Sequence, residues 1–289
     1  MTSSTEATLA PVKPRWMPRI PVLPWLVWVS ITIVAGLVLM ALLAPVLAPH
    51  DPQAIDLSAP LAGPSAAHPL GTDEAGRDLL SRLIWGARSS LIGPLAVVLA
   101  STVVGLAVGV LAGWAGGAVD TVTSGILDLM FAFPGVLLAI LAASMFGVGL
   151  RAPIIALSLA YLPWIARSVR GATLVEKERP YMAALRVQGT SSFTMCRRHL
   201  IPNIAPILIA QSAINFGYVL VDLAAISFLG LGVQAPQADW GLMVSEGQNT
   251  IATGAPEQAL AASFMFVVAV VSFNILADWL SDRVTGEDE

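Results

Sequence analysis

Apolar residues fall into six runs along the chain, each long enough to cross a lipid bilayer. Their bounds are Val22–Ala48, Leu91–Trp114, Val122–Phe146, Ala152–Val169, Ile204–Leu231 and Ala259–Leu280. About 20 helical residues span the roughly 30 Å of hydrocarbon, and a helix satisfies its own backbone hydrogen bonds there. The pattern therefore predicts an all-α polytopic membrane protein with six transmembrane helices. The fourth run is short and contains Pro163, so we expect a kink in it.

The connection formed by residues 49–90 is long enough to have structure of its own. Leu79, Leu83 and Ala87 share one face of a helical pattern, and Asp78 and Arg82 lie four residues apart on another face. This amphipathic pattern predicts a helix that lies on the membrane surface. A later connection, residues 232–258, is rich in Gly, Pro and acidic residues and predicts an ordered loop.

The connection formed by residues 170–203 predicts two short helices joined at a glycine. Pro180 suits the first position of a helix, and Gly189 suits the position just after its end. Thr190 or Ser191 can cap the second helix. The first helix would present Tyr181 and Leu185 on one side. A cationic loop can also serve only topology and lipid headgroups, and the residues alone leave both interpretations open.

Composition and charge agree with a membrane protein. Of 289 residues, 56% are hydrophobic and 12% charged, whereas soluble domains carry about 25% charged residues. The single cysteine has no partner in the chain, and the net charge of −4 gives no reason to expect a nucleic-acid partner. Eleven Lys and Arg residues fall on the side of the N-terminus and four on the other side, which predicts that both termini are cytoplasmic.

The same pattern divides the chain into segments. We expect a flexible cytoplasmic tail at 1–21, a retained N-terminal anchor helix at 22–48 and an extracytoplasmic segment at 49–90. A transport domain at 91–280 and a cytoplasmic tail at 281–289 follow. The domain contains the cytoplasmic loop 170–203.

Polar and small residues inside the apolar runs are the candidate functional positions. Asp128 and Asp222 would each cost about 2.5–3.5 kcal/mol or more if they faced lipid unpaired, so each either lines a pathway or is hydrogen-bonded between helices. A stripe of glycines at every fourth position indicates close helix contact, within the chain or with a partner subunit. Its members are Gly105, Gly109, Gly113 and Gly117.

No catalytic or metal-binding motif is evident in the sequence. His50, His68 and His199 have no ligand at metal-site spacing, and no serine is accompanied by a histidine and a carboxylate in a nucleophilic pattern. The sequence also contains no Gly-x-x-x-x-Gly-Lys-Ser/Thr phosphate loop. We therefore expect a non-catalytic protein that holds neither metal nor cofactor.

Loop 170–203 contains Ala183-Ala184-Leu185, then Gly189, and Pro202 thirteen residues after that glycine. This pattern resembles the EAA loop of ABC importer permeases. The family pattern has a glutamate where this chain has Ala183. That departure affects any ion pair the glutamate would make, but not the helix–glycine–helix shape.

Further motifs extend the resemblance over nearly all of the chain from the first apolar run to Arg283. They are similar to the second, C-type permease of dipeptide, oligopeptide and nickel importers, which are type I ABC importers. These motifs are His68-Pro69-Leu70-Gly71-Thr72-Asp73, Gly76-Arg77-Asp78, Ala132-Phe133-Pro134, Ser227-Phe228-Leu229-Gly230-Leu231-Gly232, and Asn274 with Asp278.

The resemblance implies a subunit of the prokaryotic plasma (inner) membrane that forms half of a path for short peptides. Its partners would be a second permease in a heterodimer, cytoplasmic ATPase subunits that bind ATP and Mg, and an extracytoplasmic binding protein. Nickel or glutathione-like substrates are the alternative within the family. The implied ATPase-coupling residues are Tyr181, Ala183, Ala184, Leu185, Arg186, Gly189 and Pro202.

A different class of protein competes with this interpretation. An ion-coupled secondary transporter or channel could use Asp128 and Asp222, although six spans without a visible internal repeat fit that class poorly. A membrane scaffold is a third class, and it would not need carboxylates inside its spans.

Overall fold

The computed structural model describes residues 24–285, and within that range the chain consists of helices joined by turns and loops. Five described helices are long and apolar enough to cross a membrane, and the bent pair α4–α5 would make a sixth span. All six predicted runs lie mainly in helices, so the all-α class is confirmed. The expected tail 1–21 lies outside the described residues, and α11 continues to Thr285, into the expected tail 281–289.

Helices of very different lengths follow one another along the chain. In order, they are α1 (Pro24–Leu42), α2 (Ala44–Leu47), α3 (Leu79–Ala115), α4 (Gly117–Phe131), α5 (Gly135–Phe146), α6 (Arg151–Lys177), α7 (Pro180–Val187), α8 (Ser192–Met195), a π-helical turn (Cys196–Leu200), α9 (Ile201–Phe228), α10 (Trp240–Ile251) and α11 (Glu257–Thr285).

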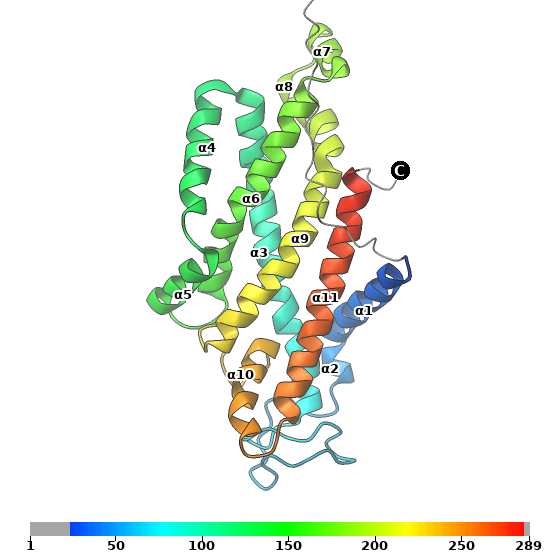
Figure 1. Cartoon of the computed structure of the whole chain (residues 1–289), viewed down its shortest axis with the longest axis vertical. Helices are drawn as coiled ribbons and strands as arrows, with labels where there is room; N and C mark the ends of the chain where they lie inside the picture. The colour runs from blue at the N-terminus through cyan, green and yellow to red at the C-terminus, as the bar shows by residue number, and fades with distance from the viewer. Residues whose placement is uncertain (1–23, 286–289) are drawn as a thin grey trace, which may run out of the picture.

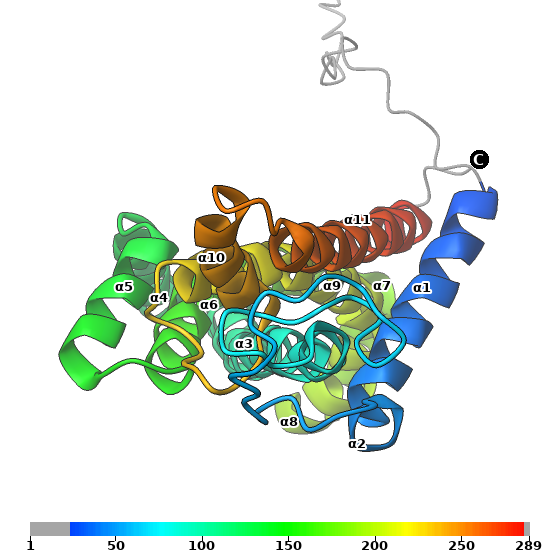
Figure 2. The ribbon, with the colours of Figure 1, turned by 90° about the horizontal axis from the view of Figure 1, so that it is seen from below.

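The long helices form a bundle with α3 at its centre, in contact with α1, α6 and α9 (Figures 1 and 2). Helices α7 and α8 lie at one end of the bundle, and α10 and the loop 48–78 lie at the opposite end (Figure 1). Helix α1 runs toward the end with α10, and α11 runs away from it. Both described ends of the chain therefore point toward the end that carries α7.

The predicted surface helix is not a separate element, and this prediction was wrong. Its residues form the first turns of α3, where Leu79 and Leu83 are buried in a core cluster with Trp240 and Met243 of α10. The apolar face that the sequence pattern assigned to lipid is covered by the protein itself. Asp78 is also not paired with Arg82, because its carboxylate caps α3 by accepting from the Ser81 N–H at 2.8 Å.

The third run is broken rather than a single helix. Helices α4 and α5 meet at residues 132–134 with a bend of 76°. Pro134 has no N–H to donate to the helix, and its ring disfavours helical geometry at Phe133. By contrast, α6 continues from Arg151 to Lys177 through Pro163.

Three glycines of the stripe bring α3 against α6 of the same chain. A Cβ atom added at Gly105 would lie 2.7 Å from Cγ2 of Ile165, and one at Gly109 would lie 2.6 Å from the carbonyl oxygen of Ala166. Gly113 faces Thr173 in the same way. A Cβ atom added at Gly117 would have no atom of the described residues within 4 Å, so Gly117 does not belong to this contact. The stripe is therefore an internal packing surface at its first three members.

Gly109→Ile is expected to lower the stability of the folded protein by about 1–3 kcal/mol, because the added side chain must displace the backbone of α6. The measurement is the midpoint of thermal unfolding in detergent. Gly125→Ile is the matched control, since Gly125 is also helical but has nothing within 4 Å. Equal midpoints for the two variants would contradict the assigned packing.

Candidate functional site

The loop 170–203 has the helix–glycine–helix form that the sequence predicts. Pro180 begins α7, and Gly189 follows its end with a φ of +75°. The N–H of Thr190 donates to the carbonyl of Leu185 at 3.1 Å, and the N–H of Gly189 donates to that of Arg186 at 3.0 Å. This pair of hydrogen bonds is the Schellman pattern, which requires a left-handed residue after the helix. Ser191 caps α8, which confirms one of the two predicted caps.

The helices on either side of this loop are longer than the sequence predicts. Helix α6 extends to Lys177, and α8 runs through the π-helical turn directly into α9. Met182 and Met195 are buried in one apolar cluster with Ile165 of α6 and Ile204 of α9. The short helices are therefore packed onto the ends of two spans, α6 and α9.

Glu176 is a buried carboxylate that holds this arrangement together. It accepts hydrogen bonds from the Tyr181 hydroxyl and from Nδ2 of Asn203, the latter at 2.8 Å. Its other oxygen lies 2.8 Å from Nε of Arg179. Burial and the hydrogen bond to Glu176 both raise the pKa of the Tyr181 phenol, so it stays a neutral donor. The network joins α6, α7 and α9.

The outward side of α7 is apolar and exposed. Ala183 and Ala184 are exposed, and the Val187 side chain is 89% exposed. Phe193 of α8, beyond the glycine in the sequence, is 74% exposed. Tyr181 and Leu185 are half-buried against the cluster of Met182.

Asp222 lies at a cavity of about 480 Å³ between the α4–α5 bend, α6 and α9. It is 21 residues past Ile201, about 31 Å of helical rise, and so lies near the end of α9 that faces α10. The Tyr161 hydroxyl donates to its Oδ2 at 2.8 Å. One carboxylate oxygen thus has a partner inside the chain, and the carboxylate as a whole lines the cavity.

Amide and aromatic groups complete the cavity wall. Oδ1 of Asn215 accepts from Gln211 at 3.3 Å, whereas its Nδ2 is buried without a hydrogen-bond partner among the described residues. Trp164 and Tyr218 also line the space and are more than half exposed on the surface of the chain. The cavity therefore offers a carboxylate acceptor and aromatic faces.

Asp128 is placed differently from Asp222. Its carboxylate pairs with Arg167 of α6, whose guanidinium lies 4.1 Å from the centre of the Phe131 ring. Asp128 is not among the residues that line the cavity. The interpretation in which an arginine satisfies this carboxylate is thus the one that the geometry supports.

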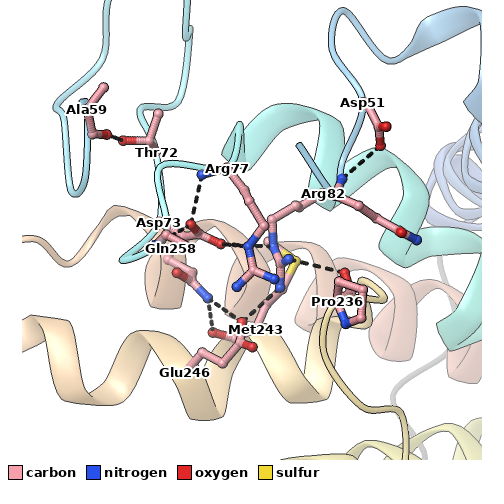
Figure 3. A network of polar contacts seen from close by, with 12 residues as sticks. Asp51, Ala59, Thr72, Asp73, Arg77, Arg82, Pro236, Met243, Glu246 and Gln258 are labelled. Atoms are coloured by element: carbon pink, nitrogen blue, oxygen red, sulfur yellow. Dashed lines mark hydrogen bonds and ion pairs between the residues drawn. The ribbon is translucent and has the colours of Figure 1, made fainter. Parts of the chain in front are cut away.

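The end with α10 is fixed by a buried ionic network around Arg82 (Figure 3). The Arg82 side chain is fully buried, with Nη2 at 2.8 Å from Glu246 of α10 and Nε at 3.4 Å from Asp73 of the loop 48–78. Gln258 of α11 donates to the same Glu246 carboxylate at 3.1 Å. Since an unpaired buried charge is costly, these contacts join the loop, α3, α10 and α11 into one body.

Sequence reasoning missed Glu176, Asn203 and Asn215. Glu176 stands at the end of an apolar run among other charged residues, and only the packing of α6 on α9 shows that it is buried. Its distance of 27 residues from Asn203 carries no local signal. An asparagine in an apolar run, as at 215, is a signal of the kind that identified Asp222.

Two family models match the chain. One, described as "Binding-protein-dependent transport system inner membrane component", matches residues 105–286. The other, described as "N-terminal TM domain of oligopeptide transport permease C", matches residues 25–64.

Similar proteins include transport permeases of several bacteria. The nickel transport system permease protein NikC of Escherichia coli (strain K12) is 36% identical over 260 residues, which are 90% of this chain and 94% of that protein. The di/tripeptide transport system permease protein DppC of Pseudomonas aeruginosa (strain UCBPP-PA14) is 37% identical, with 86% of this chain and 84% of that protein covered. A chain of the inward-facing MetNI methionine ABC transporter has the same fold, with a TM-score of 0.57 and 20% identity over 71% of this chain and 97% of that one.

Proposed function

The chain belongs to the family of binding-protein-dependent transport system inner membrane components, and from that premise we propose that it forms half of a translocation path for short peptides. It is the permease component of an ABC importer in the inner membrane. The residues that line the cavity at Asp222 are the observation that supports a peptide as the substrate.

The cavity suits the protonated amino group of a peptide. The Asp222 carboxylate can accept hydrogen bonds from it. The aromatic side chains can pack against varied side chains without selecting one. The described lining contains one carboxylate and neither histidine nor cysteine, so it favours a peptide over a nickel ion.

A second permease supplies the missing wall of this cavity. Tyr218 is 60% exposed beside Asp222, and a carboxylate that faced lipid there would cost about 2.5–3.5 kcal/mol. A partner subunit covers this face and encloses the path between the two chains. Asp128 lies outside the cavity in this arrangement, and its carboxylate pairs with Arg167.

Helix α7 is the coupling helix in this proposal. Its exposed apolar surface, with Ala183, Ala184 and Val187, docks into a groove on a cytoplasmic ATPase subunit. Tyr181 and Leu185 fasten the helix to the chain, Arg186 lies at the rim, and Gly189 and Pro202 set its direction. ATP and Mg are bound by the ATPase subunits.

Both termini and α7 lie on the cytoplasmic side, as the excess of Lys and Arg near α7 supports. The opposite end, with α10 and the loop 48–78, receives the substrate-binding protein. The Arg82 network gives that end a rigid surface on which a soluble protein can dock.

Glu176→Gln is expected to weaken coupling. The substitution removes the negative charge that pairs with Arg179, and it places a neutral amide beside two hydrogen-bond donors. The packing of α7 against α6 and α9 should lose about 1.5–3 kcal/mol of stability as a result. In the reconstituted importer, the number of peptides imported per ATP hydrolysed should fall while ATP hydrolysis continues. Glu178→Gln is the matched control, since Glu178 is exposed two residues away. An unchanged ratio in the Glu176 variant would remove this residue from the coupling path.

A further inference from the structure

Two histidines and an aspartate gather at the end of the bundle that carries α10. His50 lies after α2, His68 lies in the loop before α3, and Asp78 is the cap of α3. Nδ1 of His68 is 2.9 Å from Oδ1 of Asp78, and Nδ1 of His50 is 3.7 Å from Oδ2 of the same carboxylate. The two imidazole rings have their centres 5.0 Å apart. Sequence spacing gave no sign of this group, because the loop 48–78 folds back on itself to form it.

The spacing of the donor atoms suits one metal ion. One donor atom from each residue lies within 4.8 Å of the others. Two ligand atoms that each lie about 2.1 Å from one ion are about 3.0–3.4 Å apart in octahedral or tetrahedral geometry. His68 lies 2.9 Å from Oδ1 of Asp78, and His50 lies 3.7 Å from Oδ2, so each histidine is close to that range from a different oxygen of the carboxylate. Small rotations of two imidazole rings would complete the coordination.

The hydrogen bonds of the carboxylate also suit a cation. Oδ1 of Asp78 faces His68, and both the N–H and the hydroxyl of Ser81 donate to Oδ2. These hydrogen bonds from Ser81 to Oδ2 of Asp78 form the helix cap. They fix the carboxylate in place, as the outer partners of metal ligands do. An ion bound to both His68 and Asp78 would replace the hydrogen bond between them.

We propose that His50, His68 and Asp78 bind one divalent first-row transition-metal ion, with Zn²⁺ as the best fit to two imidazoles and a carboxylate. The ion joins three segments that are otherwise linked at this point by side-chain hydrogen bonds, and so fastens the loop 48–78 to the start of α3. Three protein ligands leave a further coordination position for water.

The test is a titration of the purified, untagged full-length chain in detergent with Co²⁺, whose visible absorption reports its coordination, followed by competition with Zn²⁺. We expect one equivalent of Co²⁺ to bind per chain, and we expect Zn²⁺ to displace the bound Co²⁺. His50→Ala should weaken binding at least about tenfold, because it removes a ligand and not merely an outer partner. The His50 side chain is 43% exposed, and the nearby hydrogen bond to Ser81 comes from its backbone, so this variant keeps the fold.

His199→Ala is the matched control, since it removes the third histidine of the chain, at the opposite end of the bundle. It should bind Co²⁺ like the unaltered protein. Binding that is equally strong in the His50 variant, or no saturable binding at one equivalent, would overturn the proposal and leave a hydrogen-bonded Asp–His pair. Both outcomes are independent of peptide uptake.

Discussion

Replacing Gly189 with valine is expected to reduce ATP-driven uptake to background while the protein still inserts in the membrane. Gly189 has a φ of +75°, and its N–H takes part in the hydrogen bonds that end α7. A β-branched residue in this conformation costs on the order of 1–3 kcal/mol. The strain is relieved by unwinding the end of α7, and the exposed apolar surface of the coupling helix then loses its fixed direction. The measurement is peptide uptake into vesicles that contain the complete importer.

The control for this variant has the same backbone strain in a different place. Gly254 has a φ of +87° in the turn between α10 and α11, and, like Gly189, has nothing within 4 Å of an added Cβ atom. Gly254→Val should therefore lose comparable stability and keep its coupling. If both variants transport equally well, or both fail equally, Gly189 has no special part in coupling.

Asp222→Asn is expected to raise the KM for a zwitterionic dipeptide by about 10- to 150-fold. The variant keeps the shape of the side chain but removes the charge that faces a protonated amino group, and a hydrogen bond to a charged group contributes about 1.5–3 kcal/mol. Tyr161 can still donate to the remaining carbonyl oxygen, so the helix packing is kept. The measurement is the concentration dependence of uptake by the complete importer.

Two controls separate substrate recognition from general damage. Asp128→Asn removes a carboxylate that pairs with Arg167 outside the cavity, and it should leave the KM unchanged. An N-acetylated dipeptide lacks the charged amino group, and the unaltered protein and the Asp222 variant should import it with similar KM values. An equal loss for the free and the acetylated peptide would show that Asp222 acts on the structure and not on the substrate.

Local signals in the sequence predicted the end of the molecule that carries α7 well. Pro180, Gly189 and Ser191 each have a backbone role that depends on their nearest neighbours, so α7, its end and the cap of α8 follow from residue type. The apolar runs fix the helices for the same reason, since length and hydropathy are local properties.

Features that depend on packing could not be predicted. The pattern around Leu79 fits a face against lipid as well as a face against α10, and only the tertiary structure selects α10. The stripe at Gly105 could meet a partner as well as α6. Glu176 and the His50–His68–Asp78 group join residues far apart in the sequence, where periodicity gives no information. The break at Phe133-Pro134 differs from these features. The sequence pattern was interpreted as one unbroken run, but Pro134 is a local signal that could have indicated the break.

The most direct test of the account compares uptake into vesicles that hold this chain alone with uptake into vesicles that hold the whole importer. The central claim is that hydrolysis by a separate ATPase, acting on α7, moves the spans around the cavity at Asp222. We predict accumulation only when the partner permease, the ATPase, the binding protein and ATP are all present. Accumulation of a solute against its gradient by this chain alone, with an ion gradient and no nucleotide, would contradict the account.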